Sequence, residues 1–193
     1  MSLKGTPSQT AGPFLQIGTM PAVAGLRTAA PERQNILADQ RTLGERIRIE
    51  GMIHDGAGMP VKDAMVEIWQ ADVNGRYGSN DFTGWGRAAT DFQTGLFFFE
   101  TIKPGPTPFR DGRPQAPHVW LSIFARGINI HLQTRLYFSD EAAANAVDPV
   151  LQLVREPALI ATLIASRAAR AGQPVYHFPI HLQGERETVF FDF

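Results

Sequence analysis

The chain has 193 residues, of which 44% are hydrophobic and 19% charged, and its formal net charge is −1. This length predicts one domain with a sizeable core, and the near-neutral charge argues against nucleic acid or an acidic membrane surface as the main partner. Cysteine is absent, which excludes disulfides, thiolate metal sites and a cysteine nucleophile. The longest apolar stretch, residues 158–165, is far shorter than the roughly 20 residues that span a bilayer, and residues 1–5 show no signal-peptide core. We therefore expect a cytoplasmic protein.

The first 45 residues predict an N-terminal arm and loop that belong to the same domain as the rest of the chain. Residues 6–18 contain two prolines and two glycines around one short apolar run, which suits an arm lying on a surface better than a core element. Residues 27–45 are mixed and polar and predict a loop, with one helical turn near residues 33–37.

From residue 46 onward the pattern predicts strands. Residues 46–53 and 64–70 alternate polar and apolar, so that one face of each strand is buried. Asp55-Gly56-Ala57-Gly58 and Thr94-Gly95 are turn signals. Three further strand candidates are residues 96–102, 119–124 and 132–138. Many short strands with regular turns predict a mainly β chain, with a β-sandwich over residues 46–193 and one or two short helices.

The last third leaves alternatives open. Ser139-Asp140-Glu141 predicts a capped helical turn, and Asp148-Pro149 predicts the start of another short helix. Residues 159–171 fit an amphipathic helix, but a strand at 162–167, paired through Gly172 with the alternating residues 175–182, fits as well.

A motif lies in the segment from Gly51 to Pro104. Val66-Glu67-Ile68-Trp69-Gln70-Ala71-Asp72 is followed by Asn74-Gly75-Arg76-Tyr77, and this arrangement resembles the core of the intradiol ring-cleaving dioxygenases. Those enzymes open catechol rings with a non-haem ferric iron held by two tyrosines and two histidines. The resemblance implies a β-sandwich of the intradiol dioxygenase type and favours the strand at 162–167.

Only half of the family's iron ligands have counterparts here. Tyr77 matches the first tyrosine and His118 the first histidine. Thr107 replaces the second tyrosine and Trp120 the second histidine, and an indole N–H can only donate a hydrogen bond. The family's active-site arginine becomes Gln115. The resemblance therefore implies no metal and no catalytic residue in this chain alone.

Both termini, together with residues 124–132 and 134–138, resemble the alpha-type subunits of heteromeric members of this family. The resemblance implies an iron-bearing beta subunit as partner, with Fe(III) on the beta chain, and a higher oligomer of alpha–beta pairs. It implies protocatechuate and O₂ as substrates and an active site at the alpha–beta interface. Thr10, Gly12 and Pro13 would line the substrate pocket shared with the beta chain. Arg126 would supply a positive charge to the substrate carboxylate or to the interface.

Two other functions stay open at this point. One is a self-sufficient homo-oligomeric dioxygenase with a rearranged ligand set, and the other is a metal-free β-sandwich binding or interaction module of dioxygenase ancestry. The hydrophobic run Val189-Phe190-Phe191-Asp192-Phe193 predicts a docked terminus, on a partner or on its own domain.

Overall fold

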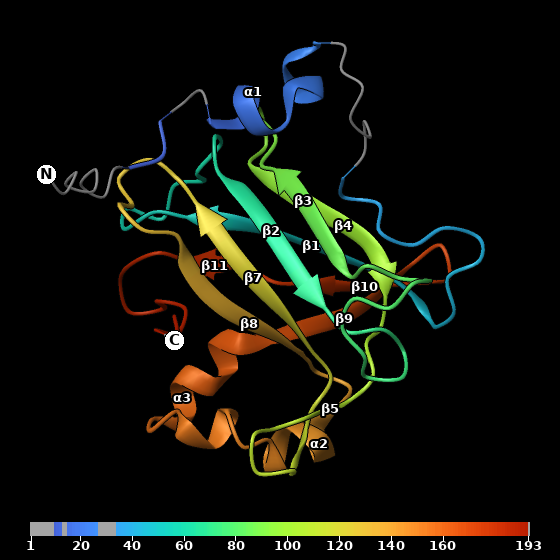
Figure 1. Cartoon of the computed structure of the whole chain (residues 1–193). Helices are drawn as coiled ribbons and strands as arrows, with labels where there is room; N and C mark the ends of the chain where they lie inside the picture. The colour runs from blue at the N-terminus through green and yellow to red at the C-terminus, as the bar shows by residue number, and fades with distance from the viewer. Residues whose placement is uncertain (1–9, 13–14, 27–33, 193) are drawn as a thin grey trace, which may run out of the picture.

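Alternating apolar residues build two facing β layers (Figure 1). The computed structural model describes residues 10–12, 15–26 and 34–192. One layer contains β3 (Trp85–Ala89), β2 (Met65–Gln70), β7 (His118–Phe124) and β8 (Leu132–Phe138). The other contains β4 (Leu96–Ile102), β1 (Arg46–His54), β10 (Gln173–His177), β9 (Ile164–Arg170) and β11 (Ile180–His181). The layers join where β8 and β9 run parallel, with Tyr137 opposite Ile164.

The core lies between the two layers. Ile47 and Ile49 of β1, Phe97 and Phe99 of β4, and Ile68 of β2 are among its fully or almost fully buried side chains. Their alternation with exposed or half-buried neighbours follows from the two-residue period of a strand. The mainly β sandwich predicted from this alternation is confirmed.

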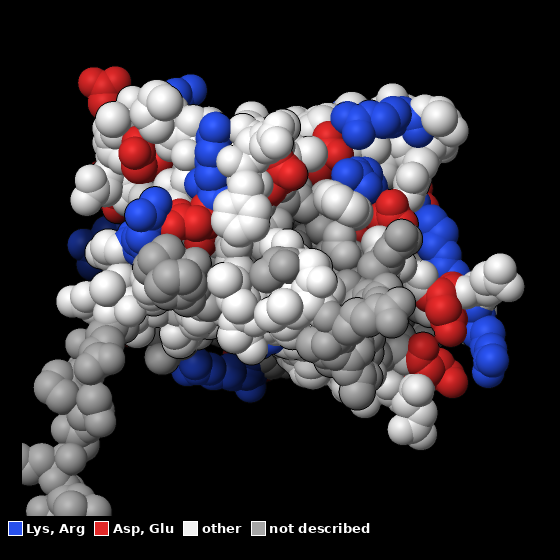
Figure 2. All heavy atoms as spheres, turned by 90° about the horizontal axis from the view of Figure 1, so that it is seen from above, with Lys and Arg blue, Asp and Glu red and all other residues white. Residues whose placement is uncertain are grey.

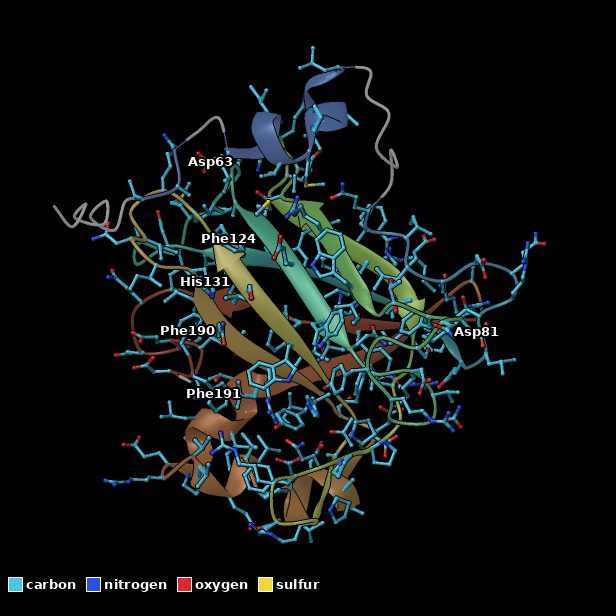
Figure 3. All side chains as sticks on the ribbon, viewed as in Figure 1. Asp63, Asp81, Phe124, His131, Phe190 and Phe191 are labelled. Atoms are coloured by element: carbon cyan, nitrogen blue, oxygen red, sulfur yellow. The ribbon has the colours of Figure 1, made fainter. Side chains whose placement is uncertain are left out.

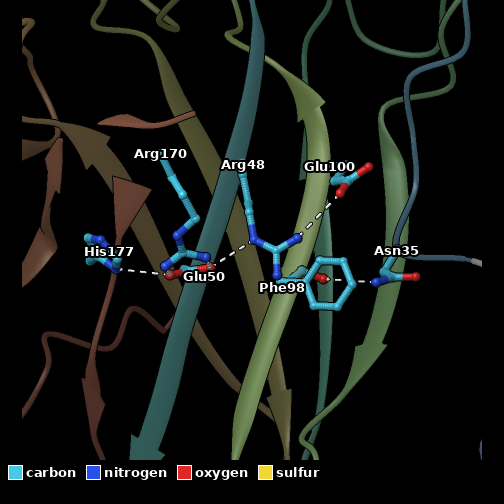
Figure 4. A network of polar contacts seen from close by, with 7 residues as sticks. All are labelled: Asn35, Arg48, Glu50, Phe98, Glu100, Arg170 and His177. Atoms are coloured by element: carbon cyan, nitrogen blue, oxygen red, sulfur yellow. Dashed lines mark hydrogen bonds and ion pairs between the residues drawn. The ribbon is translucent and has the colours of Figure 1, made fainter. Parts of the chain in front are cut away.

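A polar network closes the outer side of the β1–β10 layer (Figure 4). The Glu50 carboxylate accepts hydrogen bonds from Arg48 at 2.8 Å and from Arg170 at 2.8 Å, and its oxygen lies 3.3 Å from His177 Nδ1. The Arg48 guanidinium lies 3.7 Å from the centre of the Phe98 ring. Side chains from β1, β9 and β10 therefore meet on a carboxylate that is only 5% exposed.

The strand prediction in the last third is correct, with a later start. β9 begins at Ile164 and pairs with β10 through Ala171 and Gly172, both of which have positive φ, as a tight hairpin turn requires. Residues 157–163 instead form α3 (Pro157–Ile160) and η3 (Ala161–Leu163).

The described residues contain more short helices than the one or two predicted. The others are α1 (Leu15–Thr19), η1 (Pro21–Ala24), α2 (Ala142–Val147) and η2 (Leu151–Leu153). Each is too short to show a helical period in the sequence. Ser139 does not cap α2, since its hydroxyl accepts the Arg167 N–H instead, at 3.0 Å.

Two local predictions differ from the structure. Of the helical turn predicted near residues 33–37, residue 33 lies outside the described residues, residues 34–35 form a turn, and Ile36 forms a parallel bridge with Glu100. β3 and the two-residue strands β5 (Thr107–Pro108) and β6 (Pro114–Gln115) are absent from the prediction, because glycine, proline and alanine weaken their strand signal.

The surface carries no large single-sign region on the face seen from above, where acidic and basic side chains are interspersed (Figure 2). None of the helices in the described part of the chain has the length and apolar character needed to cross a membrane.

Candidate functional site

The structure gathers the four degenerate ligand positions near the first residue of β7. The Tyr77 hydroxyl lies 3.3 Å from His118 Nε2, and the rings of His118 and Trp120 have centroids 6.4 Å apart. Burial raises the pKa of Tyr77, while the charge of Arg135 and hydrogen bonds with Trp120 and Thr107 oppose this rise. Tyr77, Thr107, His118 and Trp120 therefore form one cluster, which we call the vestigial site.

Close backbone contacts hold the two loops of the vestigial site together. Gly75 has a φ of 75°, and a Cβ there would lie 2.0 Å from the Pro106 carbonyl oxygen. A Cβ on Gly105 would lie 2.3 Å from the Val73 carbonyl oxygen. The loop that carries Tyr77 is thus pressed against the loop that precedes Thr107, and only glycine permits this approach.

His118 is neutral and has no free lone pair in this arrangement. Its Nδ1–H donates to the Ala116 carbonyl at 2.8 Å, so Nε2 is left to accept from the Tyr77 hydroxyl. Burial, aided by the charge of Arg135, lowers the pKa of His118 to about 4. The imidazole that is predicted to match a ligand of the family therefore uses both ring nitrogens in hydrogen bonds.

Arg135 is a site residue that the motif comparison does not identify. It lies on β8, opposite Trp120, and is 5% exposed. Its Nη1 donates to Gln115 Oε1 at 2.8 Å and to the Tyr137 hydroxyl at 3.2 Å, and its guanidinium lies 4.0 Å from the centre of the Trp120 ring. A charged residue in the middle of a strand candidate was the available signal.

The carboxylate of Asp148 is linked to Arg135 through one intervening group, the hydroxyl of Tyr137. The Tyr137 hydroxyl donates to Asp148 Oδ1 at 3.2 Å. Asp148 is fully buried, and its carboxylate also accepts the backbone N–H groups of Ala116, Val150 and Leu151 at 2.8–2.9 Å. Asp148 thereby fixes residue 116, two positions before His118, as well as the turn that leads into η2.

These side chains do not fit the ferric iron that the family uses. Fe(III) needs anionic oxygen and imidazole donors. The Thr107 hydroxyl accepts from Gln115 Nε2 at 3.1 Å, and Trp120 offers only a donor N–H. The Arg135 guanidinium adds a buried positive charge beside them. Among the described residues, no group of three or more His, Asp or Glu side chains is placed to hold a metal ion.

A second cluster brings together Thr10 and Arg126, two of the four predicted pocket-lining residues. The Gly127 N–H donates to Thr10 Oγ1 at 3.0 Å, and Arg126 forms an ion pair with Asp63. Figure 3 shows Asp63 beyond the end of β7 at which Phe124 lies. Gly12 is exposed and follows Thr10 by two residues in the chain, and Pro13 lies outside the described residues. We call Thr10, Gly12 and Arg126 the arm site.

Two cavities lie beside the arm site. Cavities of about 330 Å³ and 540 Å³ share the loop that follows β7, the first lined by Thr10 and the second by Arg126. The Phe124 and His131 rings line the smaller cavity and stack with centroids 5.3 Å apart. The side chain of Arg126 is 63% exposed, so its charge remains available at the surface.

The vestigial site and the arm site lie at opposite ends of β7. His118 begins the strand, Phe124 ends it, and Arg126 follows two residues later. Six residue steps at ~3.3 Å each place the ends roughly 20 Å apart. The arm site therefore cannot contact a substrate molecule bound in the vestigial site of the same chain.

The C-terminal run docks on its own chain. Thr134 Oγ1 donates to the Val189 carbonyl at 2.8 Å, and the Phe191 N–H donates to the Gln133 carbonyl at 2.8 Å. Both phenylalanines, labelled in Figure 3, are half-buried: Phe190 packs against the core between the layers, and Phe191 packs against a smaller cluster that includes Tyr137 and Leu163. Phe193 lies outside the described residues.

The similarities to known proteins agree with this geometry. A family model described as dioxygenase matches residues 21–184. The chain is 50% identical to the protocatechuate 3,4-dioxygenase alpha chain of Pseudomonas putida, over 97% of this chain and 96% of that one. It is 43% identical to the alpha chain of Burkholderia cepacia, over 99% and 98%. The Burkholderia cepacia beta chain is 33% identical, over 80% and 72%.

The fold has the same relatives. A solved dioxygenase domain from Streptomyces sp. SirexAA-E superposes with a TM-score of 0.62 at 24% identity, covering 80% of this chain and 88% of that one. Family model, sequence relatives and fold point the same way, and the chain belongs to the intradiol dioxygenase family.

Proposed function

We propose that this chain is the alpha subunit of a protocatechuate 3,4-dioxygenase and works with an iron-bearing beta subunit. The observation that carries the proposal is the separation of the arm site from the vestigial site along β7. The arm site cannot contact a substrate bound in the vestigial site of its own chain. Its position is explained if it completes the active site of a partner chain. The names of the alpha-chain relatives support the same assignment.

The proposed reaction inserts both atoms of O₂ into the ring of protocatechuate between its two hydroxylated carbons and yields 3-carboxy-cis,cis-muconate. Fe(III) is expected on the beta chain, and the 33% identity between this chain and the Burkholderia cepacia beta chain supports a shared fold for the two subunits. The role of the alpha chain is to shape one wall of the pocket, to exclude water and to hold the beta chain. We further propose a higher oligomer of alpha–beta pairs in the bacterial cytoplasm, supported by the bacterial sources of the relatives.

The arm site supplies the residues for this wall. Gly12 and Pro13 would bring backbone close to a planar ring with no bulky side chain between them. The Thr10 hydroxyl already anchors the arm to the loop that carries Arg126. The exposed Arg126 guanidinium is placed to pair with a carboxylate from substrate or from the beta chain.

The first experiment compares this chain alone with the chain co-expressed with its beta-type partner. Iron content, visible absorbance and ring cleavage of protocatechuate are measured on both preparations. We expect no stoichiometric iron in the chain alone and an iron-containing, active complex. A coloured, active chain alone would establish the homo-oligomeric alternative, and a chain that never captures a beta partner would establish a free binding module.

A substitution tests the arm site within that complex. For Arg126→Met we expect the KM for protocatechuate to rise by about tenfold or more, since a charge-assisted hydrogen bond contributes about 1.5–3 kcal/mol. Iron content should not change. Arg113→Met is the matched control, because Arg113 is also an exposed arginine paired with an aspartate. Equal kinetics for both variants would remove Arg126 from the substrate pocket.

A further inference from the structure

Gln16 is a buried polar side chain on a segment that otherwise lies at the surface. It belongs to α1, which lies beside the ends of β2 and β3 (Figure 1). Its side chain is 1% exposed, and no other described side chain between residues 10 and 26 is buried. An amide is costly to bury without a hydrogen bond, so the burial of Gln16 points to a specific contact.

That contact holds the N-terminal arm to the residue that precedes β2. Gln16 Nε2 donates to the Ala64 carbonyl oxygen at 2.7 Å. The same oxygen accepts the Thr90 N–H at 2.9 Å, so it stays hydrogen-bonded without Gln16. Gln16 Oε1 has no hydrogen-bond partner among the described residues. The core therefore does not need this amide, and the hydrogen bond serves to hold the arm.

The arm is held on both sides of Gly12. Thr10 Oγ1 accepts the Gly127 N–H at 3.0 Å on one side, and the Gln16 amide is the anchor on the other. The Gly12 carbonyl accepts the Leu15 N–H at 3.1 Å, which turns the chain between the two anchors. The exposed Gly12 is thus presented from a segment that is fixed at two points.

An ion pair joins the two places to which the arm is anchored. Asp63 directly precedes Ala64, and it pairs with Arg126, which directly precedes Gly127. β2 and β7 also pair with each other at this end. The arm, the start of β2 and the loop that carries Arg126 are therefore one connected unit, in which a shift at Gln16 moves the arm relative to Arg126.

We infer that Gln16 is a positioning residue for the reaction proposed above. The inference rests on the proposed function, in which Thr10, Gly12 and Arg126 form one wall of the partner's pocket. With 1% of its side chain exposed, Gln16 cannot touch a substrate, so it acts through the arm that it holds. An arm that is fixed before the substrate arrives loses less conformational entropy on binding.

The test uses the complex of this chain with its beta-type partner and the variant Gln16→Met. Methionine fills a similar volume but has no donor, and the Ala64 carbonyl stays paired, so iron content and circular dichroism should not change. The KM for protocatechuate should rise by about tenfold or more, because a small displacement of a pocket wall is enough to cost such a factor, while kcat stays within about twofold. Gln40→Met is the matched control, since Gln40 is exposed and lies outside the arm.

Gln16→Glu distinguishes positioning from a general packing defect. Its carboxyl group can donate to the Ala64 carbonyl only when it is protonated, and burial favours the protonated form. The ratio of its KM to the wild-type KM should therefore fall towards one as the pH is lowered from about 8 to about 6. The same ratio for Gln16→Met should not depend on pH.

Hydrogen exchange on the full chain alone reports on the arm directly. In Gln16→Met the Gly127 N–H, which donates to Thr10, should exchange about tenfold faster than in the wild-type chain. An active wild-type complex whose KM is unchanged by Gln16→Met would overturn the inference. If Gln16→Met does not form the complex, a KM ratio of Gln16→Glu that is independent of pH would overturn it. An iron-containing wild-type complex without ring cleavage would contradict the proposed function itself.

Discussion

At the scale of single residues, the vestigial site and its neighbours are joined by hydrogen bonds of their own. The family's active-site arginine is replaced by Gln115, but a positive charge remains, because Arg135 donates to the Gln115 side chain at 2.8 Å. The positive charge therefore lies on β8, while Gln115 lies in the separate β5–β6 hairpin. Arg135, Tyr137 and Asp148 form a hydrogen-bonded chain that occupies the donors and acceptors around it.

This arrangement predicts that restoring the missing ligands is not enough to restore a metal. For Thr107→Tyr/Trp120→His we expect less than about a tenth of an iron per chain. A buried guanidinium repels each unit of metal charge by on the order of 4 kcal/mol at ~4 Å and an effective dielectric constant of ~20. Adding Arg135→Met should raise the iron content several-fold and produce tyrosinate-to-iron absorbance.

The matched control for that series is Arg135→Lys, which keeps the charge and should keep the site empty. If the double variant takes up as much iron as the triple variant, the guanidinium is not the barrier. Circular dichroism on each variant distinguishes a lost fold from a lost site.

The four degenerate positions could be found from the sequence, since Tyr77, Thr107, His118 and Trp120 stand in motifs of fixed spacing. Arg135 could not be found in this way. Its role depends on the register that places it opposite Trp120, and that register is set by packing between β7 and β8.

At the scale of elements, the site depends on how closely loops approach one another. Most strands can be predicted from their alternating polar and apolar residues, and the β9–β10 hairpin can be predicted from Gly172. β3 escapes prediction because Gly86 leaves room for Leu37, whose Cδ1 would lie 2.5 Å from a Cβ at residue 86. A strand selected by a tertiary contact carries little local signal.

The contact at Gly105 gives a test of the loops. For Gly105→Ala we expect a loss of about 2 kcal/mol in the free energy of unfolding, since the added methyl group meets backbone that cannot move freely. Urea unfolding measures the loss. Gly18→Ala is the control, because a Cβ there has nothing within 4 Å and alanine favours the helix. Equal stability of the two variants would mean that the loops are not held by this contact.

At the scale of the whole molecule, two buried groups make the fold sensitive to acid. Burial would raise the pKa of Glu50, but hydrogen bonds and charges from Arg48 and Arg170 outweigh it and lower that pKa below 4.5. The pKa of His118 is lowered to about 4. In both cases the unfolded chain binds protons more readily than the folded chain, so stability falls as pH falls.

The two groups act in different windows. The contribution of His118 is complete above its unfolded pKa of 6.5 and declines towards pH 4. The contribution of Glu50 is complete above 4.5 and declines below it. We expect Glu50→Gln to lower stability by about 2 kcal/mol at pH 7 and to flatten the decline below pH 4.5, as read from melting temperature against pH. The exposed Glu185→Gln should change neither, and an unchanged low-pH decline in Glu50→Gln would assign it to other carboxylates.

The distance between the two ends of β7 also affects how the sequences of an alpha and a beta chain can diverge from each other. Sites that are roughly 20 Å apart and share no partners change almost independently. Substitutions in the vestigial site therefore leave the arm site intact, and a duplicated subunit can lose its own chemistry while keeping its contribution to a neighbour. In such an enzyme the number of working centres equals the number of beta chains. Adding alpha chain beyond an equal ratio should then give no further turnover.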